Sequence, residues 1–254
     1  MKRDLALHAT TLLLAGTLGG VLLTQAACKR SGPDIKIGVI AELSGDIPAV
    51  GDSCKKAAEL AISEINESGG VKVAGTHHLL RLLIEDGQGK GDASVAAAQR
   101  LIDQEGVIAV IGPNASSGAV PAAAVAEEKK TLLVSPWSTA PRLTRDDGDK
   151  MRRFVYRVCY SDEFQARSLA KFATGYIKAT KLAILFNPES EAPKAQAELM
   201  KKEFESRGGQ VVAMETYAAG TTDYAEQMKK IAAGAPDLVY LPSYYVEVPE
   251  QLKQ

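Results

Sequence analysis

The sequence predicts an α/β protein made of two doubly wound, Rossmann-like lobes, each built around a parallel sheet. Three observations predict this fold class. From residue 34 onward, short apolar runs alternate with longer stretches of helical periodicity, as β-α-β units require. A segment with two prolines and several charges, residues 135–150, interrupts this alternation once. The chain has 254 residues, 46% of them hydrophobic and 24% charged, which suffices for two buried cores.

The first lobe is expected over residues 34–157. Short apolar runs predict its strands at 35–40, 79–85, 107–111, 132–134 and 154–158. Helical periodicity predicts helices at 51–66, 92–104 and 118–129. One face of the first helix carries Ala57, Ala58, Leu60, Ala61 and Ile65. Asp92 is the predicted N-cap of the second helix, because its carboxylate can accept hydrogen bonds from the first helical N–H groups.

The second lobe is expected over residues 158–254. Its predicted helices are 162–178, 193–207 and 223–233, and its predicted strands are 181–186, 210–215 and 238–241. Three strands make a thin core, and the pattern stops inside what looks like the start of another helix. We therefore expect the second lobe to be incomplete and the chain to be truncated at its C-terminal side.

The N-terminal segment has the pattern of an export signal. Lys2 and Arg3 precede an apolar stretch at 12–23, and small residues stand before Cys28. At about 1.5 Å per residue this stretch is too short for a bilayer core of about 30 Å. We expect residues 1–27 to be removed as a signal peptide, with a retained anchor helix as the alternative.

Cys28 directly follows small residues, which resembles the lipobox of bacterial lipoproteins, where this thiol is acylated. Gln25 stands where a lipobox usually has Leu. Residues 28–33 would form a polar, flexible tether. We favour lipidation of Cys28 over plain secretion. The two remaining cysteines, Cys54 and Cys159, permit one disulfide in an oxidising compartment, or are two separate buried thiols; the sequence leaves both open.

The sequence lacks the residues that several kinds of chemistry require. The net charge of −1 and the absence of a basic run argue against nucleic-acid binding. His77 and His78 are adjacent, so on a strand they would point to opposite faces and could not share a metal. No G-x-S-x-G elbow occurs, and no G-x-G-x-x-G follows the first strand. We read the glycines of 87–91 as a tight turn rather than a phosphate loop, and we expect no metal, no cofactor, no catalytic residues and no enzyme activity.

Open α/β sheets bind ligands at the carboxyl ends of their strands. After the third strand, GPNASSGAV places Ser116 and Ser117 at the start of a helix. Their hydroxyls, the free backbone N–H groups and the helix dipole could bind a small anion such as a carboxylate. The alternative is simple N-capping by one serine.

Two more strand-end loops carry polar and aromatic side chains. One holds Trp137, Ser138 and Thr139, and the other holds Tyr244 and Tyr245. Together with the serines, these loops predict a cleft that holds a small polar molecule with an apolar part.

At this point the sequence resembles the periplasmic substrate-binding proteins of the leucine/isoleucine/valine type, which serve ABC importers. The resemblance rests on several stretches in the same order: IKIGVIAELSGDIPAVG, AAELAISEINESGG, VIAVIGPNASSGAV, LLVSPWSTAPRLT, YRVCYSDEFQA, GGQVVAMETYAAGTTDY and PDLVYLPSYY. It implies the type I fold of this family, in which two α/β lobes joined by hinge strands trap a ligand when they close.

The resemblance also implies roles for individual residues. It places Ser116 and Ser117 on a ligand carboxylate, the Trp137 backbone and the Thr139 hydroxyl on the polar head group, and Tyr244 in the far wall. Ser138 stands between Trp137 and Thr139 in the same loop and is a further candidate ligand-binding residue.

Two positions depart from the family pattern and are candidate ligand contacts. Val50 stands where branched-chain members usually have an aromatic residue, and Glu191 stands where they tend to have Tyr-Gly. The family acid that pairs with a ligand ammonium comes from a strand beyond Gln254. These departures put aliphatic specificity in doubt.

The expected function is therefore the extracytoplasmic binding component of an ABC importer. It would capture a branched-chain or related small amino acid or amide and deliver it to the permease membrane subunits. Its expected location is the periplasm or cell envelope, held to a membrane by a lipid anchor. The alternatives are a ligand-sensing regulatory receptor of the same fold and an exported α/β enzyme.

Overall fold

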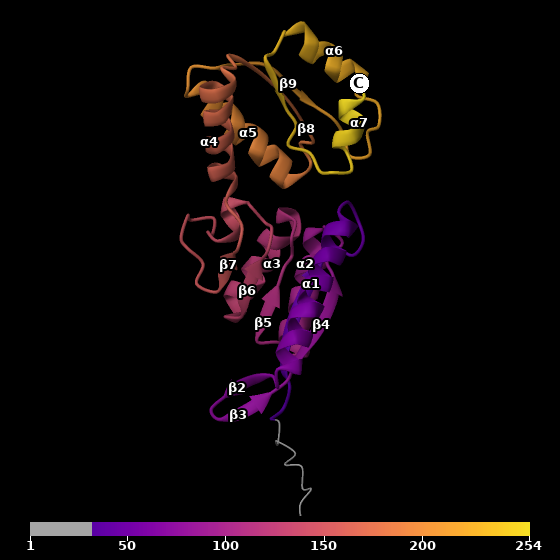
Figure 1. The fold of residues 1–254 in the computed structure, drawn as a ribbon, viewed down its shortest axis with the longest axis vertical. Helices are drawn as coiled ribbons and strands as arrows, with labels where there is room; N and C mark the ends of the chain where they lie inside the picture. The colour runs from indigo at the N-terminus through magenta and orange to yellow at the C-terminus, as the bar shows by residue number, and fades with distance from the viewer. Residues whose placement is uncertain (1–31) are drawn as a thin grey trace, which may run out of the picture.

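The structure, a computed structural model, describes residues 32–254. Figure 1 shows two lobes, one above the other, with the first half of the chain in the lower lobe and the second half in the upper lobe. The expected signal peptide 1–27, the acylation site Cys28 and most of the tether 28–33 lie outside the described residues. Over residues 32–254, no helix combines the length and the apolar character needed to cross a membrane.

The first lobe contains a five-stranded parallel sheet in the order β4-β1-β5-β6-β7. All five predicted strands are confirmed: β1 (Ile35–Ala41), β4 (Leu80–Asp86), β5 (Ala109–Ile111), β6 (Leu132–Ser135) and β7 (Val155–Arg157). The chain runs outward from β1 to β4 and returns past β1 to β5. The strand order therefore reverses between β1 and β5, the place where open α/β sheets form ligand crevices.

Helices cover both faces of this sheet, because successive residues of a strand point to opposite sides. Val39 and Ala41 of β1 pack with α1 (Pro48–Glu67). Between them, Ile40 joins the core on the other face, which contains α2 (Gly91–Gln99) and α3 (Ser116–Lys129).

Of two predictions about the start of α2, one is confirmed and one is wrong. The glycines of 87–91 form a tight turn from β4 into α2, closed by the Lys90 N–H donating to the Gly87 carbonyl at 3.0 Å. The predicted N-cap at Asp92 is wrong, because the helix already begins at Gly91 and the residue before it, Lys90, makes no side-chain cap bond. The helix continues as a π-helical turn, Arg100–Gln104.

A small antiparallel hairpin, β2 (Val71–Val73) with β3 (Thr76–His78), was not predicted. His77 and His78 belong to it, and their Nδ1 atoms lie 2.9 Å and 2.8 Å from the carbonyl oxygens of Gly69 and Pro33. The two histidines are thus engaged by backbone groups. Over residues 32–254, no group of three or more His, Cys, Asp or Glu side chains is placed to hold a metal ion.

The second lobe contains a three-stranded parallel sheet in the order β10-β8-β9. Its predicted strands are confirmed as β8 (Lys181–Phe186), β9 (Gln210–Thr216) and β10 (Leu238–Tyr240). One face packs against α4 (Asp162–Phe172), which continues as the π-helical turn Ala173–Ile177, and against α5 (Glu191–Glu205). The other face packs against α6 (Ala225–Ala233), and a short α7 (Val248–Leu252) follows β10.

Cys54 and Cys159 are both free thiols in the structure, so the disulfide considered from the sequence is not formed. Cys54 lies on α1 in the core formed with β1 and β4, whereas Cys159 follows β7. In the sheet, β5 and β6 separate β1 from β7. Cys54 thus packs against β1, β4 and β5, whereas Cys159 follows the edge strand β7.

Candidate functional site

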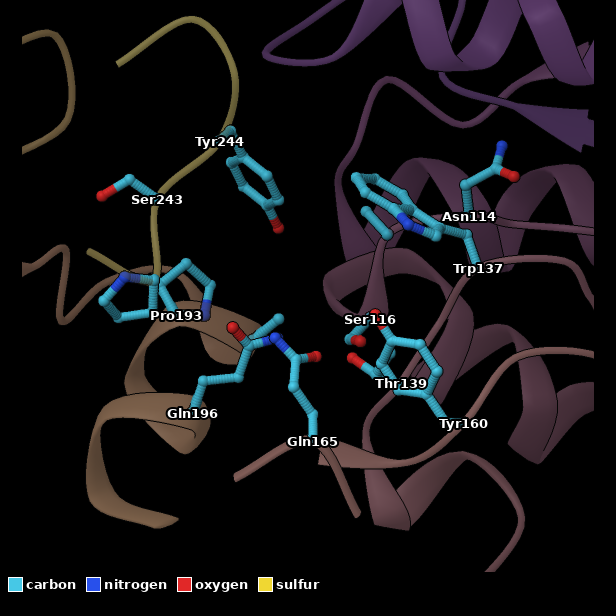
Figure 2. A pocket seen from close by; sticks show the side chains of 13 residues that line it. Asn114, Ser116, Trp137, Thr139, Tyr160, Gln165, Pro193, Gln196, Ser243 and Tyr244 are labelled. Carbon is cyan, nitrogen blue, oxygen red and sulfur yellow. The ribbon is translucent and has the colours of Figure 1, made fainter. Parts of the chain in front are cut away.

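A cavity of about 200 Å³ lies between the two lobes, and both lobes contribute to its walls. The first-lobe wall comes from the loops after β5 and β6, and the second-lobe wall comes from α4, α5 and the loop after β10. Figure 2 shows the side chains that converge on this space: Asn114, Ser116, Trp137, Thr139, Tyr160, Gln165, Pro193, Gln196, Ser243 and Tyr244. The structure thus brings four of the predicted site residues together, namely Ser116, Trp137, Thr139 and Tyr244.

A buried carboxylate holds the loop after β5. Glu42, the residue after β1, is fully buried. Its Oε1 accepts hydrogen bonds from the backbone N–H groups of Asn114 and Ala115, both at 2.9 Å, and its Oε2 accepts one from the Asn114 side-chain amide at 2.7 Å. Charge-assisted bonds of this kind are about twice as strong as neutral ones. Glu42 therefore fixes the loop that leads into α3.

Ser116 is the first residue of α3, and the residue before it, Ala115, makes no side-chain cap bond. The N-capping alternative for the serines is therefore wrong, and the first N–H groups of the helix have no intrahelical acceptor. The Ser116 hydroxyl lies 3.0 Å from the Ser138 hydroxyl. Together, these groups give the first-lobe wall the donors that a carboxylate needs.

Ser117 and Ser138 do not line this cavity. The Ser117 hydroxyl donates to the Gly89 carbonyl at 2.8 Å, and Ser117 lines an adjoining cavity of about 140 Å³ together with Glu191. Ser138 is buried, and its backbone N–H donates to Ser135 Oγ at 3.1 Å. Ser135 in turn donates to the Pro113 carbonyl at 2.6 Å, which ties the loops after β5 and β6 together.

The two sequence departures also lie outside this cavity. Val50, in the first turn of α1, lines neither this cavity nor the cavities of about 260 Å³ and 140 Å³ that share Tyr244 with it, whereas Asp46 and Ile47, just before α1, line the smaller of these two. Glu191 of the second lobe lies 3.8 Å from the Arg142 guanidinium of the first lobe. Burial raises the pKa of Glu191, and the nearby Arg142 opposes this rise.

The second-lobe wall is made of larger side chains. Tyr244 faces Trp137 across the space in Figure 2, with ring centroids 6.3 Å apart and ring planes tilted by 43°. Burial raises the pKa of Tyr244 far above its usual value, so its hydroxyl stays protonated. Gln165 of α4 and Gln196 of α5 add amide groups opposite Ser116 and Thr139. Tyr245, next in sequence, is exposed and does not line the cavity.

A second buried acid lies behind the cavity lining. Asp162, the first residue of α4, is fully buried. Its backbone N–H donates to the Thr139 carbonyl at 2.9 Å, and its Oδ1 accepts a bond from the Gln196 amide at 2.9 Å. Burial raises the pKa of Asp162, while the Thr139 hydroxyl and the Gln196 amide oppose this rise. The residues that line the cavity itself carry no Lys, Arg, Asp or Glu among those described.

Sequence reasoning missed most of the second-lobe wall. Asn114 could have been found, because it stands in the loop that was singled out and an acid, Glu42, follows the strand beside it. Gln165 and Gln196 had no such signal, because a polar residue in an amphipathic helix is usually solvent-exposed. Only the packing of α4 against α5 turns these two amides toward the first lobe.

The profile of the periplasmic binding protein family matches residues 34–254, which include the complete cavity lining. The chain belongs to the periplasmic binding protein family. Its strand order, parallel sheets and cavity between two α/β lobes agree with that membership.

Members of this family that resemble the chain include the Leu/Ile/Val-binding protein BraC3 of Rhizobium johnstonii. It is 32% identical over 214 residues, which cover 84% of this chain and 56% of BraC3. A leucine binding protein, LivK of Thermotoga maritima, has a TM-score of 0.75 and 29% identity, covering 87% of this chain and 61% of its own. LivJ of Streptococcus pneumoniae, solved in complex with isoleucine, has a TM-score of 0.76 and 28% identity, covering 86% and 60%. The chain thus spans less than two thirds of the length of these relatives.

Proposed function

We propose that the chain is the substrate-binding part of an ABC importer, which captures a branched-chain or related small amino acid between its lobes and delivers it to permease subunits. One observation carries this proposal. Donors at the start of α3 and the hydroxyl of Thr139 face amides and an aromatic ring of the other lobe across one small cavity. Such a cavity closes around a ligand when two lobes approach each other.

The relatives support the ligand class. The proteins that resemble the chain carry the names Leu/Ile/Val-binding protein and leucine binding protein, and one was solved with isoleucine. The cavity of about 200 Å³ is smaller than the sites of drug-sized molecules, which occupy about 300 Å³ or more. A small amino acid fits both the size and the mixed polar and apolar lining.

Calorimetry and thermal unfolding with a panel of L-amino acids, amides and small organic acids test the proposal. A ligand at about 100 times its dissociation constant stabilises the folded protein by about 2.7 kcal/mol. We expect at least one small amino acid to bind and to raise the unfolding temperature. Ser168→Ala, on the exposed surface of α4, serves as a control that keeps full binding. If no compound binds, the function lies elsewhere.

We further propose that the protein acts in the periplasm and that acylation of Cys28 anchors it to a membrane. The basic start, the apolar stretch and the small residues before Cys28 support this. Mass spectrometry of the protein purified from membranes should find the lipid on Cys28 as the new N-terminus. Cys28→Ser should release the protein into the soluble fraction. An unmodified Cys28 would contradict the anchor and leave the binding function untouched.

A further inference from the structure

The hairpin of β2 and β3 does not line the ligand cavity, but it holds the segment that leads into β1. The Gly32 N–H donates to the His77 carbonyl at 2.8 Å, and His78 Nδ1 lies 2.8 Å from the Pro33 carbonyl oxygen. The His78 ring packs so closely on Gly32 that a methyl group at position 32 would collide with it. The chain therefore enters the first lobe fixed against β3.

This hairpin lies at the opposite end of the first lobe from the cavity. The five strands of the sheet are parallel, so they all start at one edge and end at the other. The cavity loops follow strand ends, whereas β3 leads directly into the start of β4. Figure 1 shows β2 and β3 at the end of the lower lobe that is furthest from the upper lobe. At about 3.3 Å per residue, the seven residues of β1 separate the hairpin from the cavity by about 20 Å.

One face of the hairpin carries exposed valines. In the antiparallel register, Val71 lies opposite His78 and Val73 lies opposite Thr76, and opposite residues share a face. Both valines are exposed, and Val73 is 48% exposed. Because His78 also packs on Gly32, the chain enters the lobe beside this valine face.

Further exposed apolar side chains lie at the edge where the strands start. Ile108 directly precedes β5 and is 62% exposed, Leu132 begins β6, and Leu79 directly precedes β4. Single apolar side chains on a surface are ordinary, but these three share one edge with the two hairpin valines. This edge therefore offers an apolar surface to an interfacial partner.

The proposed lipid anchor is attached close to this edge. Cys28 stands four residues before Gly32, and four fully extended residues span at most about 14 Å. Lys29 and Arg30 directly follow Cys28, and each basic residue near an anionic lipid surface contributes about 1 kcal/mol. A tether this short also holds the hairpin at the surface at an effective concentration of about millimolar, so weak apolar contacts suffice.

We propose that the hairpin of β2 and β3, with the strand starts beside it, is a membrane-docking surface that rests on the anionic lipid to which Cys28 is attached. The cavity is then turned away from the membrane. The inference rests on the lipid anchor of the proposed function and adds an orientation that the anchor alone does not fix. The contacts of Gly32 and Pro33 with β3 place the exit of the tether beside the valines. Delivery to a permease in the same membrane then requires the hairpin to leave the surface, which weak contacts allow.

Tryptophan fluorescence of the acylated full chain in vesicles tests this orientation. The vesicles contain phosphatidylethanolamine, phosphatidylglycerol and lipids brominated near the headgroup, because bromine quenches an indole only at close range. Trp137 is the single tryptophan of the sequence and lies in the cavity wall, away from the hairpin. In a Trp137→Phe background, Val73→Trp moves the tryptophan to the hairpin. Tyr245→Trp in the same background is the matched control, because Tyr245 is also 48% exposed but lies in the second lobe.

We expect the brominated lipid to remove most of the fluorescence of the Val73→Trp protein and to leave that of the unsubstituted and Tyr245→Trp proteins unchanged. An unquenched Val73→Trp protein, or equal quenching of all three proteins, would overturn the inference and leave the lipid anchor and ligand binding standing. Mass spectrometry that finds no acyl chain on Cys28 would overturn the anchor and this inference together. The proposal of amino-acid binding would still stand.

A second measurement avoids a new tryptophan, since this residue itself favours membrane interfaces. Hydrogen exchange compares the acylated protein in vesicles with the soluble Cys28→Ser protein. Amides of residues 71–79 should exchange more slowly in the anchored protein, and those of residues 242–247 should not change. Val73→Asp places a charge on the valine face and should abolish this difference without releasing the protein from the vesicles. Equal exchange of 71–79 in both forms, or a difference that persists in Val73→Asp, would contradict docking through the hairpin.

Discussion

The two walls of the cavity are built in different ways. The first-lobe wall consists of short loops at strand ends, and its polar groups are backbone N–H groups and small hydroxyls tied down by buried Glu42 and Ser135. The second-lobe wall consists of long side chains from helices, chiefly Gln165, Gln196 and Tyr244. A rigid wall of backbone donors suits the invariant head group of a ligand, whereas exchangeable side chains suit its variable part.

Removal of Glu42 should have the largest effect on stability and binding, because Glu42 accepts the hydrogen bonds that hold the first-lobe wall in place. Glu42→Ala leaves two backbone N–H groups and one amide buried without their acceptor, at about 1–3 kcal/mol for each unsatisfied group. We expect the free energy of unfolding to fall by about 3 kcal/mol or more and ligand binding to be lost. Urea unfolding measures the change, with Glu59→Ala on the exposed side of α1 as the control. A loss no larger than that of the control would mean that the loop is held by other contacts.

Ser116→Ala should weaken binding without unfolding the protein. The hydroxyl is buried beside Ser138 and, in the proposed complex, meets a charged carboxylate, a bond worth about 1–3 kcal/mol. We expect about a 10-fold or greater loss of affinity in calorimetry. Ser117→Ala is the comparison, because the neighbouring hydroxyl is already committed to Gly89 and faces another cavity. Equal losses for both serines would show that the two act as a pair, contrary to their placement.

The difference between a wall of strand-end loops and a wall of helix side chains also explains which parts of the site could be predicted from the sequence. Strand-end loops follow apolar runs that are visible in the sequence, so the strands, their order along the chain and the meeting of Ser116, Trp137 and Thr139 at one cavity could be predicted. The wall built from helix side chains could not, because helical periodicity identifies the buried face but not the neighbour it meets. Gln165 and Gln196 therefore became visible only when α4 was packed against α5.

Other errors have similar physical causes. The hairpin of β2 and β3 has strands of three residues, too short for an alternation of apolar and polar residues to register. An even number of cysteines permitted a disulfide, but only the fold shows that Cys54 lies on α1 against the middle of the sheet while Cys159 follows the edge strand β7. The first miss comes from a local pattern that is too short, and the second from long-range packing that a local pattern does not record.

The buried acid at the junction of the two walls should make stability depend on pH. The folded-state pKa of Asp162 is raised, so the folded protein binds more protons than the unfolded chain above a pH of about 4, and the stability contribution of this group is lost as pH rises through the raised pKa. Asn does not titrate. The stability of Asp162→Asn relative to the unsubstituted protein should therefore improve with rising pH, by at most about 1.4 kcal/mol per pH unit. Urea unfolding across this range checks the sign, and a relative stability that falls with pH would contradict it.

The smallest effect is expected at the ion pair between the exposed Arg142 of the first lobe and the half-buried Glu191 of the second. Arg142 lies 3.8 Å from Glu191 across the lobes and also pairs with Asp147 at 2.9 Å, and the Arg142 side chain is 61% exposed. Exposed ion pairs contribute about 0–1 kcal/mol, so Arg142→Gln should change stability by less than about 0.5 kcal/mol. Because the contact bridges the lobes, its removal should instead speed ligand release, by a factor of about two or less. Stopped-flow dissociation at low and high salt measures this; a much larger acceleration would mean that exposed contacts, and not the cavity walls, hold the lobes closed.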